Sequence, residues 1–221
     1  MRIEHEGERF ILGGVSEART IRDEPQLRAV IGSPVEVTVA KVAERLNDLT
    51  KQFIERSPFV CVGTATSGGG LDVSPRGDPA GFVRILDERT LLLPERPGNR
   101  LADTLTNLLS DPRIALLFLI PGVGETLRVN GWAEISIDPA LLTRFPMQGK
   151  LPRTVIVVHV EAVYFQCPKA LVRSELWNPA RHIERKSLPS TGTMLADISR
   201  GAAGGEQYDR DYPERLKATI Y

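Results

Sequence analysis

Basic side chains lie beside a strand end and a predicted helix start between residues 71 and 131. Arg76 closes the sequence Ser74-Pro75-Arg76, and Gly98-Asn99-Arg100 opens a predicted helix over residues 99–110. A helix start has unpaired backbone N–H groups and the positive end of the helix dipole, so an anion binds there readily. Arg76, Gly98, Asn99 and Arg100 therefore predict a phosphate site.

Each of these residues also has a simpler interpretation. Arg76 can be a surface cation on an edge strand, and Asn99 can be an ordinary helix cap. A bare cap needs no cations beside it, yet Arg96 and Arg100 flank Asn99 closely. Charge-assisted bonds to a phosphate dianion are worth about 1.5–3 kcal/mol each, which favours the phosphate interpretation.

A second group of candidates comes later in the chain. Thr126 and Arg128 belong to the polar side of an alternating strand predicted over residues 126–137. Lys169, Arg173 and Trp177 are spaced by four, which puts them on one face of a predicted helix. The strand residues form either a solvated face or a ligand contact. Lys169, Arg173 and Trp177 either belong to a helix that only covers the rest of the fold or present a cation–aromatic cluster to a ligand.

No other constellation predicts catalysis or metal binding. His5, His159 and His182 lie far apart and lack metal-ligand spacing. No Ser-His-Asp order, P-loop or Gly-x-Gly-x-x-Gly stands out. We therefore predict no metal and name no catalytic residue, because no side chain is an evident general acid or base.

Composition restricts the class of protein. The 221 residues suffice for one domain with a full core, and 42% hydrophobic with 25% charged residues fit a globular protein. A net charge of +0 argues against nucleic-acid binding by bulk electrostatics. No apolar run approaches the ~20 residues of a membrane span, and the first residues lack an apolar signal region. We expect a cytoplasmic protein in which Cys61 and Cys167 are buried and reduced.

The periodicity of the sequence predicts a mainly β fold. Helices are predicted over residues 24–31, 38–56 and 99–110, and hairpin-linked strands over 59–65, 72–76, 82–86, 90–94, 113–120, 126–137 and 154–165. We interpret these elements as a small, six-stranded antiparallel barrel with peripheral helices. The strand over 113–120 is apolar on both pleat faces, so core must cover one face, and a helix or second subunit the other.

The chain order suggests three parts. Residues 1–57 form an N-terminal helical segment packing on the barrel, residues 58–180 the barrel domain, and residues 181–221 a C-terminal extension. The extension contains a basic loop, a helix predicted near residues 193–199, a glycine-rich linker over 201–205 and a charged tail predicted to be helical from Pro213. We find no internal repeat.

Four motifs in this order resemble the pyridoxamine 5'-phosphate oxidase-like flavoproteins, which have a split-barrel, FMN-binding fold. The motifs are Ser74-Pro-Arg76-Gly, Pro94 with the Gly98-Asn99-Arg100 helix start, the apolar strand 114–120, and residues 125–131. The segment 167–177 is similar to a subgroup described only as FMN-dependent enzymes. The resemblance covers about residues 35 to 180.

The resemblance implies a homodimer with two FMN sites at the subunit interface. By position, Arg76 matches a strand arginine that reaches the FMN phosphate, and Gly98, Asn99 and Arg100 match the segment that grips it. Thr126 stands where the family has a glutamine near the flavin ring, and Pro94 replaces a threonine.

The expected function is an FMN-dependent oxidoreductase acting on a small-molecule substrate or electron donor. The Tyr, Arg and Ser set that holds the substrate phosphate in true pyridoxine-phosphate oxidases is absent from residues 139–152, which argues against pyridoxal phosphate synthesis. The alternatives are a non-catalytic flavin- or haem-binding protein on the same scaffold and a cofactor-free structural dimer.

Overall fold

The structure, a computed structural model, describes residues 20–98 and 100–221. The chain divides after Ala40 into two compact units. In the first unit, α1 (Glu24–Ile31) has the bounds that the sequence predicts, with Asp23 as its N-cap. Gly32 ends α1 in a left-handed conformation (φ 78°), as glycine does at many helix ends. A short helix, α2 (Glu36–Ala40), follows.

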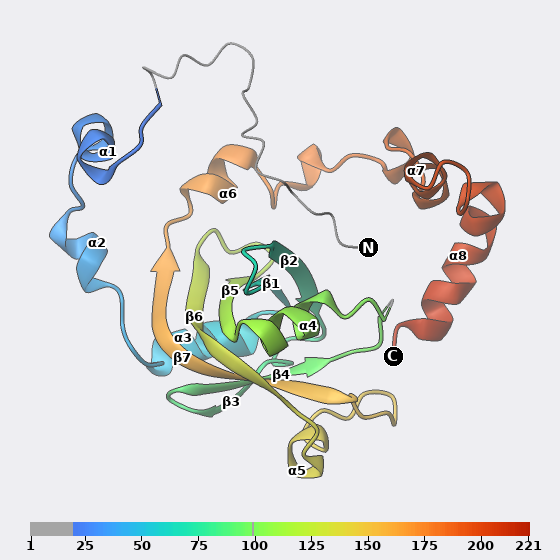
Figure 1. Ribbon diagram of the computed structural model, residues 1–221, viewed down its shortest axis with the longest axis horizontal. Coiled ribbons are helices and arrows are strands. Elements are labelled where there is room, and N and C mark those ends of the chain that lie inside the picture. The colour runs from blue at the N-terminus through green and yellow to red at the C-terminus, as the bar shows by residue number, and fades with distance from the viewer. Residues whose placement is uncertain (1–19, 99) are drawn as a thin grey trace. The chain divides into compact units, whose positions relative to one another are not determined.

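The second unit, Lys41–Tyr221, is built on one antiparallel sheet of seven strands in the order β2-β1-β5-β6-β7-β4-β3 (Figure 1). The strands are β1 (Phe59–Ala65), β2 (Leu71–Gly77), β3 (Arg84–Asp87), β4 (Thr90–Glu95), β5 (Arg113–Leu119), β6 (Thr126–Ser136) and β7 (Thr154–Gln166). The predicted antiparallel barrel with peripheral helices is confirmed. The count of six strands is wrong by one, because each of the seven ranges predicted as strands overlaps one, the short edge strand β3 included.

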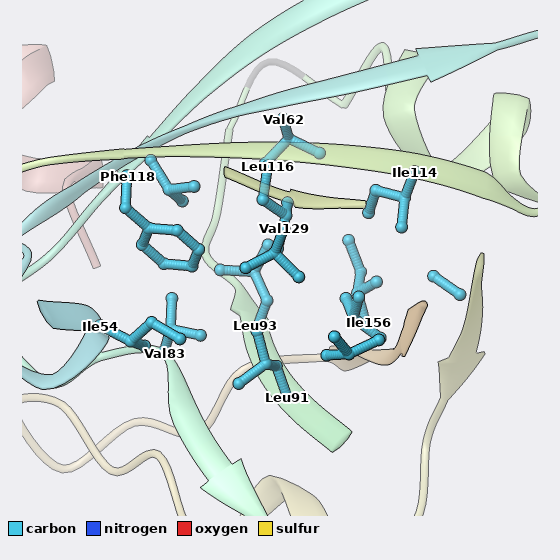
Figure 2. Close-up of a cluster of buried hydrophobic side chains, with 14 of the residues drawn as sticks. Ile54, Val62, Val83, Leu91, Leu93, Ile114, Leu116, Phe118, Val129 and Ile156 are labelled. Carbon is cyan, nitrogen blue, oxygen red and sulfur yellow. The ribbon is translucent and has the colours of Figure 1, made fainter. Parts of the chain in front are cut away.

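One hydrophobic core fills the inside of the curled sheet. Side chains from α3 (Asp48–Arg56) and from five strands converge there, as Figure 2 shows for Ile54, Leu93, Phe118 and Val129. All four of these residues are fully buried, at 0% exposure. Along β1 and β5 the core side chains alternate with less buried ones, so the period of two places every second side chain in the core.

The two halves of the sheet meet along a seam, which gives the barrel its closure. Arg76 of β2 donates through Nε to Glu95 of β4 at 3.2 Å, although β2 and β4 stand near opposite ends of the strand order. The helix α4 (Asp103–Ser110) lies against β1, β2 and β6 beside this seam.

The predicted helix over residues 38–56 is wrong in its middle. Ala43 pairs with Val163 of β7 through two main-chain hydrogen bonds of 3.0 and 2.7 Å, which requires extended backbone. Asn47 then starts the new helix α3 in a capping box with Thr50. The apolar spacing is continuous in the sequence, but a strand pairing and a cap divide it.

Helical segments complete the second unit. They are α5 (Pro139–Leu142), α6 (Lys169–Ser174), the 3-10 turns η2 (Pro179–Arg181) and η3 (Arg185–Ser187), α7 (Thr191–Ile198) and α8 (Gly205–Thr219). The prediction for the last helix is wrong at its start, because α8 begins eight residues before Pro213 and contains it. In residues 20–98 and 100–221, no helix combines the length and the apolarity that crossing a bilayer requires.

Gly131→Ala is expected to destabilise the protein by about 3 kcal/mol. Gly131 lies where the β6–β7 register shifts, and a Cβ atom there would stand 1.9 Å from the carbonyl oxygen of His159. Urea unfolding measures the loss. Gly68→Ala is the control, because its new Cβ would lie 3.8 Å from the nearest atom, the hydroxyl of Thr66. Equal stability losses in the two variants would contradict the steric argument.

Candidate functional site

A cavity of about 1050 Å³ opens at the seam between β2 and β4. The start of α4, the loop before β7 and the end of the chain complete its wall. Its cationic lining residues are Arg76, Arg96, Arg100, Lys150 and Arg153, and its acidic ones are Asp72, Glu95 and Asp103. The cations outnumber the acids, so the cavity favours an anionic ligand.

Arg76 is held in the cavity wall by several contacts. Besides Glu95, its guanidinium donates to the hydroxyls of Ser74 and Thr104, the latter from Nη2 at 3.2 Å. The side chain is 18% exposed, and that of Glu95 is 22% exposed. Arg76 is therefore held in one orientation and is still partly exposed to the cavity.

The start of α4 faces the same cavity, but it lies later in the chain than the sequence predicts. The helix begins at Asp103, not at residue 99, because Arg100 and Ala102 adopt left-handed conformations with φ of 65° and 58°. Ala102 is the N-cap and offers no side-chain acceptor, so the first N–H groups of α4 lack a side-chain cap. Gly98 and Arg100 line the cavity in the loop before the helix, and Asn99 lies outside the described residues.

A buried ion pair supports the cavity wall below this loop. Arg96 donates through Nε to Asp78 at 2.7 Å, and the side chains are 16% and 0% exposed. Nη1 of Arg96 also donates to the carbonyl oxygen of Phe145 at 3.0 Å. These bonds fix Arg96, so it serves as a rigid cation of the wall.

The second predicted group does not line this cavity. Thr126 is buried at 4% exposure, while Arg128 is exposed and lies over the ring of Tyr164 at 5.8 Å. Lys169 and Arg173 are exposed on α6. Pro94, which belongs to the first group in the sequence, is buried in β4 and does not reach the cavity lining described here either.

The prediction that Lys169, Arg173 and Trp177 share one helical face is wrong. The helix α6 ends at Ser174, and Glu175 turns the chain with a left-handed conformation (φ 51°). Trp177 therefore lies beyond the helix, where its indole N–H donates to the carbonyl oxygen of Val123 at 2.8 Å.

Arg76 and Arg128, one from each predicted group, project to opposite faces of the sheet. Arg76 is paired with Val60, whose side chain is fully buried in the core, so Arg76 projects to the inner face at the seam. Arg128 stands between the core residues Leu127 and Val129, so it projects to the outer face. One chain thus places a phosphate candidate and a ring candidate on different faces of its sheet.

Among the cavity-wall residues that were not candidates in the sequence are Lys150, Arg153 and Tyr221. Lys150 and Arg153 flank a proline in a predicted loop, and Tyr221 follows α8. They reach the cavity only through the tertiary fold. The only local signal was the pair of cations just before the apolar strand β7.

A family model described as Pyridoxamine 5'-phosphate oxidase matches residues 46–167, more than half of the chain. No curated protein matches the sequence.

Several solved structures are similar to parts of the chain. HupZ of Group A Streptococcus is 20% identical over 53% of this chain and 91% of its own, with a TM-score of 0.45. A Clostridium acetobutylicum protein related to general stress protein 26, of the pyridoxinephosphate oxidase family, is 16% identical over 54% and 86%, with a TM-score of 0.40. An FMN-binding protein of Syntrophomonas wolfei is 12% identical over 53% and 88%, also with a TM-score of 0.40.

The match of the family model covers the whole sheet and the loop that carries Gly98 and Arg100. The chain therefore belongs to the pyridoxamine 5'-phosphate oxidase family.

Proposed function

We propose that the protein is a homodimeric, cytoplasmic, FMN-dependent oxidoreductase whose cofactor phosphate binds in the cavity at the seam. The main support is one juxtaposition: the uncapped start of α4, Arg76 and Arg100 all lie on the wall of one cavity. Helix N–H groups and guanidinium groups together are the donors that bind a phosphate dianion best.

The charges around this cavity fit a dianion. The positive charge of Arg76 is balanced by the carboxylate of Glu95, and that of Arg96 by the carboxylate of Asp78. Arg100 and Arg153 form no ion pair with another described residue, so their charges are available to a ligand. Burial of part of the cavity wall strengthens this attraction, because fewer water molecules screen it.

The division of the candidates between two faces supports a dimer. The outer face of β1 and β2 is apolar and open: Leu71 is 85% exposed, Val73 71% and Phe59 37%. Exposed apolar surface of this kind is typical of a protein interface. In a homodimer, Thr126, Arg128, Lys169, Arg173 and Trp177 of one chain are proposed to meet the flavin ring whose phosphate the other chain holds.

Bound FMN would supply the electron transfer, and the chain would bind and orient it. The proposed role of Arg76, Gly98 and Arg100 is to hold the phosphate. The family model is that of an oxidase of pyridoxamine 5'-phosphate, but the substrate of this chain is proposed only as a small molecule.

The visible spectrum of the purified protein with added FMN tests the proposal. Binding is expected to quench FMN fluorescence at micromolar protein, and sedimentation is expected to give a dimer. Anaerobic NADH, NADPH or a reduced deazaflavin should then bleach the flavin band. Absence of quenching would reject FMN binding, and a holo-protein that no donor reduces would reject the oxidoreductase role.

Arg100→Ala is expected to weaken FMN affinity by roughly 1.5–3 kcal/mol, about tenfold or more. The change removes one charge-assisted donor from the cavity wall without unpairing a described acidic group. Fluorescence titration measures the affinity. Arg144→Ala is the control, because Arg144 is also exposed and is not a described part of the cavity wall. Equal affinities for the two variants would place the phosphate elsewhere.

A further inference from the structure

Residues 190–221 form a helical arm, in which α7 and α8 pack on one another. Asp209 of α8 ties them together: its carboxylate accepts from the hydroxyl of Ser190 and from the amide of Gly192, the latter at 2.7 Å. A Cβ atom at Gly192 would lie 2.3 Å from the carbonyl oxygen of Gly205, so the two helices touch closely. The arm therefore has its own internal support.

The far end of the arm enters the cavity at the seam. Ala218, Thr219 and Tyr221 belong to the cavity wall. The hydroxyl of Tyr221 donates to Asp78 at 2.7 Å, and the ring lies 5.8 Å from the guanidinium carbon of Arg96. Lys150 donates from Nζ to the main-chain oxygen of Tyr221 at 2.6 Å.

Tyr221 thus binds the same groups that give the cavity its charge. The side chain of Asp78 is fully buried, and its carboxylate accepts hydrogen bonds from both the guanidinium of Arg96 and the hydroxyl of Tyr221. The hydrogen bond to Asp78 raises the pKa of Tyr221 above its ordinary value, as expected for a phenol that donates to a carboxylate. A charged acceptor makes this bond stronger than an ordinary surface contact.

We propose that residues 190–221 are a lid of the cavity and that Tyr221 is the latch that holds the lid closed. When Tyr221 leaves Asp78, one wall of the cavity opens, and Lys150 is released to bind an anion. When Tyr221 returns, the wall closes over whatever the cavity holds. The inference rests on the proposed function only for the identity of that ligand, the FMN phosphate.

The latch is tested by trypsin cleavage after Lys217, an exposed residue of the last turn of α8. Cleavage there requires the end of α8 to detach and unfold locally. Tyr221→Phe removes the bond to Asp78 and is expected to speed cleavage after Lys217 about tenfold. Tyr208→Phe is the matched control, because it removes a hydroxyl from the same helix without touching the latch.

The lid is tested by the access of a thiol reagent to the cavity. Met147 lines the cavity beside Lys150, so Met147→Cys places a reporter on the cavity wall. Its rate of labelling by the dianionic disulfide DTNB is compared in the parent and Tyr221→Phe backgrounds. The background labelling of Cys61 and Cys167 is measured in each background without the reporter cysteine and is subtracted from the rate with it. Labelling is expected to be about tenfold faster when the latch is removed.

Faster cleavage together with faster labelling supports the lid. An unchanged cleavage rate in Tyr221→Phe, and also in Tyr221→Phe combined with Lys150→Met, overturns the latch. Faster cleavage with unchanged labelling overturns the lid, because the arm would then detach without opening the cavity. Neither assay contains FMN. A failure of either one therefore leaves the proposed function standing, and a failure to bind FMN leaves both assays interpretable.

Discussion

Arg76→Ala is expected to lower FMN affinity by about a hundredfold or more, which corresponds to about 3 kcal/mol. The variant loses donors that lie on the cavity wall, and it also leaves Glu95 without the guanidinium that it contacts at 3.2 Å. An uncompensated carboxylate then repels the phosphate that the arginine attracted. The loss is therefore larger than that of Arg100→Ala, which leaves no described acid unpaired.

Three further variants separate attraction from repulsion. Arg76→Ala combined with Glu95→Gln removes both charges, so part of the lost affinity is expected to return. Glu95→Gln alone frees Arg76 for the ligand and is expected to tighten binding. Arg76→Lys keeps the charge but loses the planar fork that holds Glu95 and Thr104 together, so it should recover only part of the affinity. Fluorescence titration at fixed ionic strength measures all four, and wild-type affinity in Arg76→Ala would exclude the seam as the phosphate site.

The strands could be predicted from the sequence because their signal is local. Alternation along β6 puts Leu127, Val129 and Ala133 in the core, as the structure has them. The start of α4 could not be predicted in this way. Its position depends on the left-handed conformations of Arg100 and Ala102, which neither residue type favours and which the surrounding loop must impose.

The cavity could be predicted only in part. Arg76, Gly98 and Arg100 lie in motifs that carry a signal of their own, and the structure brings these residues to one cavity. Lys150 and Tyr221 come from segments more than 40 residues further along the chain, and only the closure of the barrel and the course of the arm bring them there. No spacing rule connects such segments, because their proximity is a property of the packed fold.

Sequence alone also does not reveal that Arg76 and Arg128 project to opposite faces of the sheet. Period-two alternation correctly puts Arg128 opposite to Leu127 and Val129. It does not say that Arg76 projects to the inner side of the curled sheet, which follows from the pairing of Arg76 with Val60. The proposal that a second chain joins the two groups therefore rests on the register of the sheet.

Asp78→Ala is expected to destabilise the protein by about 3–5 kcal/mol, the usual cost of unpairing a buried charge. Asp78 is 0% exposed in its side chain, and its removal leaves the Arg96 guanidinium, 16% exposed, without a counter-charge. The hydroxyl of Tyr221 loses its acceptor as well.

Urea unfolding without FMN measures this loss, and Glu206→Ala is the control. Glu206 pairs with Arg210 on the surface of α8 while 92% exposed, so its removal should cost at most about 0.5 kcal/mol. Asp78→Ala combined with Arg96→Met removes both charges of the buried pair, and much of the stability should return because no unpaired charge remains. If Asp78→Ala lost as little stability as Glu206→Ala, water would have to reach the guanidinium of Arg96 freely. The wall of the cavity would then not be rigid at Arg96, and both the proposed phosphate site and the proposed latch depend on that rigidity.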